Sequence, residues 1–102
     1  MIIYNVTVKV EPEVQEDWLQ WMKNIHIPDV MDTGYFLKYK LTRVISMDEA
    51  DGVTYSIQYT CQDMATLHQY QINHSARLQA EHNARYLHKF VAFRTLLEVL
   101  AE

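Results

Sequence analysis

The histidines and tyrosines are the side chains of this sequence that could do chemistry. The chain holds five His and seven Tyr among 102 residues. An imidazole exchanges protons near neutral pH, and a tyrosine joins an aromatic face to a hydroxyl that donates or accepts a hydrogen bond. His26 ends the first predicted helix, and His74 and His82 fall on one stripe of the second. These three are the candidate catalytic residues, whereas His68 and His88 are predicted at the surface or at element ends.

The spacing of the histidines argues against a metal site. His74 and His82 lie eight residues apart, which is roughly 12 Å along a helix. One ion with ligand bonds of about 2 Å cannot bridge that distance. The sequence contains no HExxH motif and no pair of histidines four residues apart. We therefore predict no metal ligands, with a site built from His26, His74 and a strand residue as the alternative.

Four tyrosines share one phase of the predicted strands and would point to the same sheet face. If that face meets the helices, the second helix brings its histidines toward it. The result is a cleft suited to a flat aromatic or other small organic ligand. Its predicted lining is Tyr39, Tyr55, Tyr59, Tyr70, His74 and His82. The alternative is an ordinary core, with tyrosine hydroxyls at its edge and hydrogen-bonded histidines within it.

The strands that position these residues follow from the alternation of apolar and polar side chains. This period of two predicts strands over 2–10, 35–46 and 53–61. A fourth strand is predicted over 88–100, where the sequence is apolar on both faces apart from two charges. An acidic turn over Met47–Gly52 joins the second strand to the third.

Two helices complete the pattern. The first begins at Pro12 and ends near His26, because Pro28 disfavours a helical residue before it, with one further turn as the alternative. The second runs over 64–86. The apolar face of the first helix is predicted to hold Val14, Trp18, Trp21, Met22 and Ile25.

The element order β-α-β-β-α-β predicts an α+β, ferredoxin-like domain that occupies all of 1–102. Two helices cover one face of an antiparallel four-stranded sheet, with the first and third strands central. The other face is expected to be covered by a second copy in a dimeric α/β-barrel arrangement, because exposed apolar patches mark interfaces; a monomer with a wet face is the alternative. We expect that face to hold Asn5, Thr7, Ser56, Gln58, Arg94 and Glu98, together with Ile3, Phe90, Ala92, Leu96 and Leu100.

Composition limits the classes of partner. The formal charge is −4 and no basic patch stands out, so we expect no nucleic-acid binding. No apolar run approaches the roughly 20 residues of a membrane helix. Cys61 is the only cysteine, and the N-terminus does not look like a signal peptide, so we expect a cytoplasmic protein with Cys61 as a small buried residue.

Several long segments carry a resemblance to a known family. They are MIIYNVTV, WLQWM, HIPDVM with the following Thr33-Gly34, TYSIQYT and FVAFRTLLEV. The chain resembles an uncharacterised bacterial family of proteins of about this length, catalogued as a domain of unknown function. That resemblance implies a ferredoxin-like fold and no particular activity.

More loosely, the topology is similar to the dimeric α/β-barrel superfamily, which includes small monooxygenases, haem-degrading enzymes and isomerases. Asn5 and His82 fall where haem-degrading members carry working residues. Their supporting tryptophan is absent, and Tyr70 is the nearest aromatic candidate. This resemblance implies haem as an alternative cofactor, while the residues themselves indicate none.

We therefore predict a homodimer that binds a small organic ligand in a Tyr/His-lined cleft between sheet and helices. The alternative is an oxidoreductase of the monooxygenase or haem-degrading type, or an isomerase. A third hypothesis is a protein-interaction module without a small ligand, which predicts no pocket.

Overall fold

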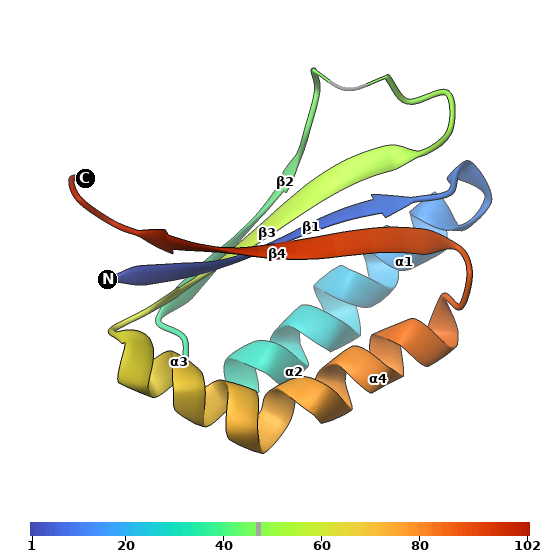
Figure 1. Ribbon diagram of the computed structural model, residues 1–102. Coiled ribbons are helices and arrows are strands. Elements are labelled where there is room, and N and C mark those ends of the chain that lie inside the picture. The colour runs from blue at the N-terminus through green and yellow to red at the C-terminus, as the bar shows by residue number, and fades with distance from the viewer. Residues whose placement is uncertain (47) are drawn as a thin grey trace.

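The computed structural model describes residues 1–46 and 48–102 and contains one antiparallel four-stranded sheet (Figure 1). The sheet order β2-β3-β1-β4 places the first and third strands at the centre, as the ferredoxin-like fold requires. The strands are β1 (Ile2–Val10), β2 (Lys38–Arg43), β3 (Val53–Cys61) and β4 (Phe90–Glu98). The predicted fold class is confirmed. The bounds of β1 and β3 match the prediction, whereas β2 and β4 are shorter than predicted. Met47, at the start of the predicted acidic turn, lies outside the described residues.

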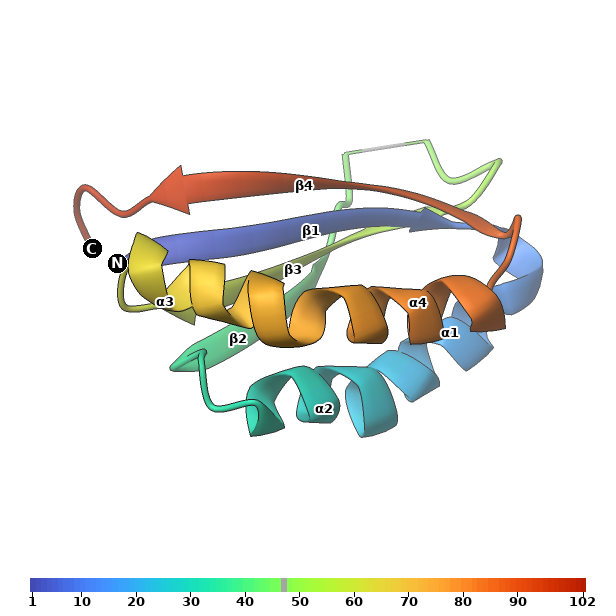
Figure 2. The same cartoon turned by 60° about the horizontal axis from the view of Figure 1, so that its bottom comes forward.

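Both helical runs lie on the same face of the sheet (Figures 1 and 2). The first comprises a 3-10 turn at Pro12–Val14, α1 (Gln15–Trp21), a π-helical turn at Met22–His26 and α2 (Ile27–Asp32). The second comprises α3 (Met64–Tyr70), a π-helical turn at Gln71–Ser75 and α4 (Ala76–Arg85).

The prediction that the first helix ends near His26 is wrong, because the chain stays helical to Asp32. Pro28 lies in the first turn of α2, directly after the π turn. Proline is tolerated in a first turn, where its missing N–H leaves little unsatisfied.

Each π turn places one extra residue between two successive buried positions of its helix. In the first run the buried side chains step by five from Met22 to Ile27, and Ile25, predicted on the apolar face, is 49% exposed. In the second run they step by five from Tyr70 to Ser75. A regular α-helix steps by three or four.

The strand pairing fixes which face of β4 meets the helices. Arg94 lies opposite Val6, and Ala92 lies opposite Val8, which is buried against the helices. Directly paired side chains share a face, so the prediction that alternate β4 residues face outward is wrong for Phe90, Ala92, Arg94, Leu96 and Glu98. The alternation of apolar and polar residues could not show which side chains of β4 face the helices, because β4 is apolar on both sides.

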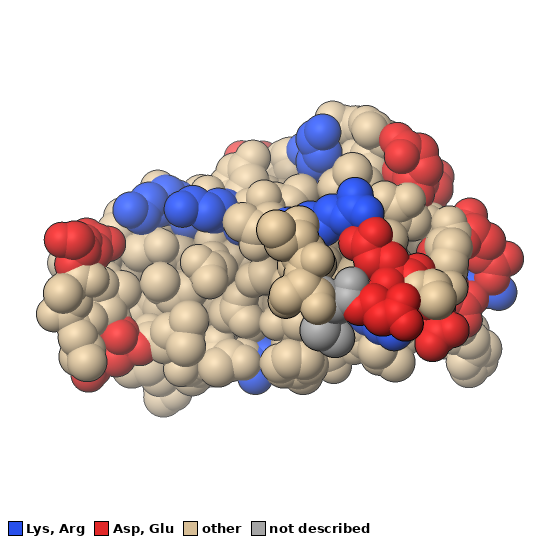
Figure 3. Space-filling model, turned by 90° about the horizontal axis from the view of Figure 1, so that it is seen from above, with Lys and Arg blue, Asp and Glu red and all other residues tan. Residues whose placement is uncertain are grey.

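The outer face of the sheet carries a polar centre beside an apolar strand. Asn5 and Ser56 lie there as predicted, and the Ser56 hydroxyl donates to Asn5 Oδ1 at 2.6 Å. On β4 the outward side chains Val91, Phe93 and Leu97 are 69%, 62% and 38% exposed. Figure 3 shows uncharged atoms over most of the centre of this face, with acidic side chains gathered toward its ends.

Two glycines allow a matched test of local packing. Gly52 has φ +152°, and a Cβ there would collide with the Val10 carbonyl oxygen, whereas Gly34, at φ +82°, has open space around the same position. We expect Gly52→Ala to lower the free energy of unfolding by about 2–3 kcal/mol and Gly34→Ala by only about 1 kcal/mol, from backbone strain alone. Urea unfolding midpoints measure both. Equal losses would contradict a steric role for Gly52.

Candidate functional site

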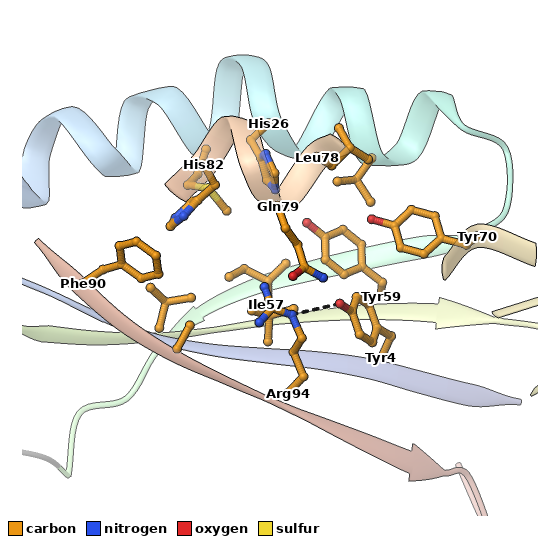
Figure 4. Close-up of a pocket in the computed structure, with 15 residues that line it drawn as sticks. Tyr4, His26, Ile57, Tyr59, Tyr70, Leu78, Gln79, His82, Phe90 and Arg94 are labelled. Carbon is orange, nitrogen blue, oxygen red and sulfur yellow. Dashed lines mark hydrogen bonds between the residues drawn. The ribbon is translucent and has the colours of Figure 1, made fainter. Parts of the chain in front are cut away.

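A cavity lies between the sheet and the two helical runs (Figure 4). It measures about 480 Å³ when its open mouth is included, but the centres of water-sized groups can occupy only about 40 Å³ of it. That smaller space holds about two or three waters, so a larger occupant requires lining side chains to move. The lining consists of Tyr4, Val6, Val8, Met22, His26, Val30, Ile57, Tyr59, Tyr70, Leu78, Gln79, His82, Phe90, Ala92 and Arg94.

Polar groups from both layers converge on this apolar chamber. The hydroxyls of Tyr59 and Tyr70 and the amide of Gln79 point toward its middle, and Arg94 approaches from the sheet (Figure 4). The Gln79 amide nitrogen donates to Ser75 Oγ at 2.7 Å. Among the described residues, neither of these two tyrosine hydroxyls has a hydrogen-bond partner within the chain. Burial raises the pKa of both tyrosines, so they remain neutral phenols.

Arg94 brings a positive charge to the cavity. Its Nε donates to the Tyr4 hydroxyl at 3.0 Å (Figure 4). None of the described residues that line the cavity is acidic. Among the described residues, Arg94 also forms no ion pair, whereas the other arginines, Arg43, Arg77 and Arg85, each pair with a carboxylate.

His82 is held as a neutral imidazole. Trp18 Nε1 donates to His82 Nε2 at 2.9 Å, so Nε2 carries the lone pair and the proton resides on Nδ1. The pKa of His82 is lowered to about 4, mainly by burial; a hydrogen bond to Asn83 raises the pKa and the charge of Arg94 lowers it, both by smaller amounts. The Trp18 indole therefore sets the tautomer of a buried base.

His26 has an unpaired nitrogen. Its Nδ1 is buried without a hydrogen-bond partner in the described chain. The ring stacks on Trp21 at 5.1 Å between centroids and meets His82 edge to face at 5.8 Å. Burial lowers the pKa of His26 to about 4, with smaller contributions from His82 and Arg94. At neutral pH the cavity therefore holds two uncharged imidazoles.

The structure brings together only part of the predicted lining. Tyr59, Tyr70 and His82 line the cavity, and so does His26. Tyr55 lies apart from it, stacked on Trp18 at 4.8 Å with its hydroxyl accepting from Gln15 Nε2 at 2.6 Å.

Two further predicted residues also lie outside the cavity. Tyr39 is 49% exposed on the edge strand β2. His74 packs against Tyr35 and Tyr70, because the π turn gives its place on the inward stripe to Ser75.

Sequence reasoning missed Gln79 and Arg94. Gln79 gave no signal, since polar residues are common on helix surfaces. Arg94 did give one, as a lone cation in an apolar strand, but its phase was misassigned. Asn5 faces away from the cavity, so it does not join His82 as the haem-degrading pattern implies. Among the described residues, no group of three His, Cys, Asp or Glu side chains could hold a metal ion.

The solved structures that resemble this chain share its fold. An EthD family protein from Bacillus halodurans has a TM-score of 0.70 at 17% identity, covering 98% of this chain and 100% of that one. A dimeric ferredoxin-like protein from an uncultured marine organism has a TM-score of 0.70 at 13% identity, covering 100% and 97%. A mutant of MhuD with two manganese protoporphyrin IX bound per active site has a TM-score of 0.71 at 11% identity, with the same coverage. At these identities the likeness shows the fold alone.

No curated protein matches the chain. No helix among the described residues is both long and apolar enough to cross a bilayer. One family model, described as "Domain of unknown function (DUF4286)", matches residues 1–100. Because the match covers nearly the whole sequence, the chain belongs to the DUF4286 family.

Proposed function

We propose that this protein binds a small organic molecule in the cavity between sheet and helices. The observation that carries the proposal is His26 Nδ1, which is buried in an apolar chamber without a hydrogen-bond partner in the described chain. The hydroxyls of Tyr59 and Tyr70 point into the same chamber (Figure 4). Buried polar groups in proteins are nearly always hydrogen-bonded. A few such groups converging in an apolar pocket are typical of small-molecule sites.

The test is thermal unfolding against a panel of small aromatics, quinones, flavins, haem and short organic acids and amides. A ligand at a hundred times its dissociation constant adds about 2.7 kcal/mol, which raises Tm by about 10 °C or more in a domain of this size. Ala92→Leu fills the cavity and should abolish the shift. Ala80→Leu makes the same change on an exposed helix position and should preserve it.

Val6→Leu provides a second, milder filling of the cavity if Ala92→Leu disturbs folding, which circular dichroism reveals. A flat panel at millimolar concentrations would overturn the proposal. So would a shift that survives both cavity-filling substitutions.

The enzyme alternative has one observation in its favour, the unpaired His26 Nδ1. A base with a pKa of about 4 is weak at neutral pH, whereas general bases work best with a pKa near the operating pH. The site therefore supports binding better than proton transfer.

The cavity as it stands does not fit a haem. Its inner space holds only about two or three waters before lining side chains move, which is too little for a macrocycle. The His82 Nε2 lone pair already accepts from Trp18, so that nitrogen is engaged and unable to serve as an axial ligand. We therefore derive no step through haem, which stays in the ligand panel as an explicit test.

We further propose a homodimer through the outer sheet face. Exposed Val91, Phe93 and Leu97 support it, since contiguous exposed apolar side chains mark interaction surfaces. Two of the similar structures are described as dimeric ferredoxin-like proteins. The polar centre of the face, with Asn5 and Ser56, would then lie between two sheets.

A further inference from the structure

The charge inside the cavity is unbalanced. Of the described side chains that line it, Arg94 is the only charged one, and the two histidines beside it are held neutral. The presence of Arg94 contributes to lowering the pKa of both histidines, which places its charge within electrostatic reach of each ring. Arg94 is exposed at this edge of the sheet, and among the described residues it has no carboxylate partner, whereas the other three arginines each have one.

The two terminal nitrogens of the Arg94 guanidinium are free to bind a ligand. Nε donates to the Tyr4 hydroxyl at 3.0 Å, which orients the planar guanidinium. The terminal nitrogens have no hydrogen-bond acceptor among the described residues. Two parallel N–H groups of a guanidinium match the two oxygens of a carboxylate. Arg94 is exposed on the edge strand β4, so an anion can reach it from the mouth of the cavity.

The apolar side chains that line the cavity favour a ligand that carries one charge and is otherwise mostly apolar. Val6, Val8, Ile57, Leu78 and Ala92 surround the polar groups. A dianion such as a phosphate monoester would leave one charge without a partner against these side chains, which is costly. A carboxylate matches the single charge of Arg94.

We propose that the molecule bound in this cavity is a small organic carboxylate, with its carboxylate on the Arg94 guanidinium and its apolar part against the aromatic and aliphatic walls. This rests on the proposed function and specifies its ligand class. Tyr59 and Tyr70 supply neutral hydroxyls for a further polar group of that molecule. The outer sheet face, which we propose as the dimer interface, lies on the opposite side of the sheet from Arg94. A second copy bound at that face therefore does not supply a carboxylate to Arg94.

The experiment compares carboxylates with their neutral amides: acetate with acetamide, butyrate with butyramide, and benzoate with benzamide. Each is titrated by calorimetry and thermal unfolding into the native protein. At least one carboxylate should bind at least tenfold more tightly than its amide. Arg94→Met should remove that preference. Arg94→Lys keeps the charge but lacks the two parallel N–H groups of a guanidinium, so it should retain part of the preference. Arg77→Met, on an exposed helix position, should leave it unchanged.

The outcomes separate this inference from the proposed function. Equal binding of acids and amides, lost in Ala92→Leu, would retain the cavity as a binding site and overturn the carboxylate. An acid preference that survives Arg94→Met would also overturn it. If neither series binds and the wider panel is also flat, both proposals fail.

Discussion

Acidification from pH 6.5 to pH 4 should remove several kcal/mol of folding stability. His26 and His82 each have a folded-state pKa of about 4, against 6.5 for the free side chain. Between these values the unfolded chain binds protons that the folded chain does not, so the free energy of unfolding falls as the pH falls. At 1.36 kcal/mol per pKa unit, each histidine contributes about 3 kcal/mol to this loss. About one pH unit or more above 6.5 both states are neutral, and these histidines add no pH dependence there.

The loss is comparable to the whole stability of a small domain, which is about 5–15 kcal/mol. Urea unfolding at intervals of half a pH unit measures it. The double variant His26→Gln with His82→Gln should be much less sensitive over this range, and glutamine can still accept from the Trp18 indole. His68→Gln, at an exposed position, should keep the full pH dependence. A steep fall that persists in the double variant would show that other groups cause it.

Phe93→Asp should convert the protein from a dimer to a monomer. Phe93 is 62% exposed at the middle of β4 on the outer sheet face. In a face-to-face dimer each copy would bury one unpaired carboxylate, at several kcal/mol per ion. Two such ions raise the dissociation constant by on the order of a thousandfold or more, since each 1.4 kcal/mol is tenfold.

Light scattering coupled to gel filtration gives the mass in solution. Ile72→Asp is the matched control, because Ile72 is 76% exposed on the helical side and the same acidic change there should leave the dimer intact. Dissociation by both variants would point to an interface that includes the helices. A native protein that is already monomeric at high concentration would contradict the proposed dimer.

The sequence predicted the strands best where only one face is apolar. In β1 and β3 polar side chains alternate with Tyr4, Val8, Tyr55 and Tyr59, and a period of two then gives bounds, phase and buried face together. In β4 both faces are apolar, so only the pairing with β1 reveals that Arg94 points toward the helices.

The π turns explain the other differences at the site. Helical periodicity assumes one constant step, and it therefore placed Ile25 and His74 on inward faces. Nothing in the composition of 22–26 or 71–75 marks these segments as π-helical. The turns are consistent with packing both ends of each helix against one sheet, which is a tertiary requirement that local pattern does not contain.

A π turn is geometrically equivalent to one residue inserted into an α-helix. Deleting a single residue from 22–26 would shorten the buried step from Met22 to Ile27 to the four residues of a regular helix, so Trp18 and Val30 would both keep facing the sheet. The same holds for 71–75, where Tyr70 and Leu78 would both stay buried. Making either turn α-helical with every residue kept would instead rotate one end of the helix by about 100° relative to the other. A one-residue gap in a family member at either segment would therefore leave the rest of the cavity lining in place, whereas a one-residue gap elsewhere in these helices would change which side chains face the cavity.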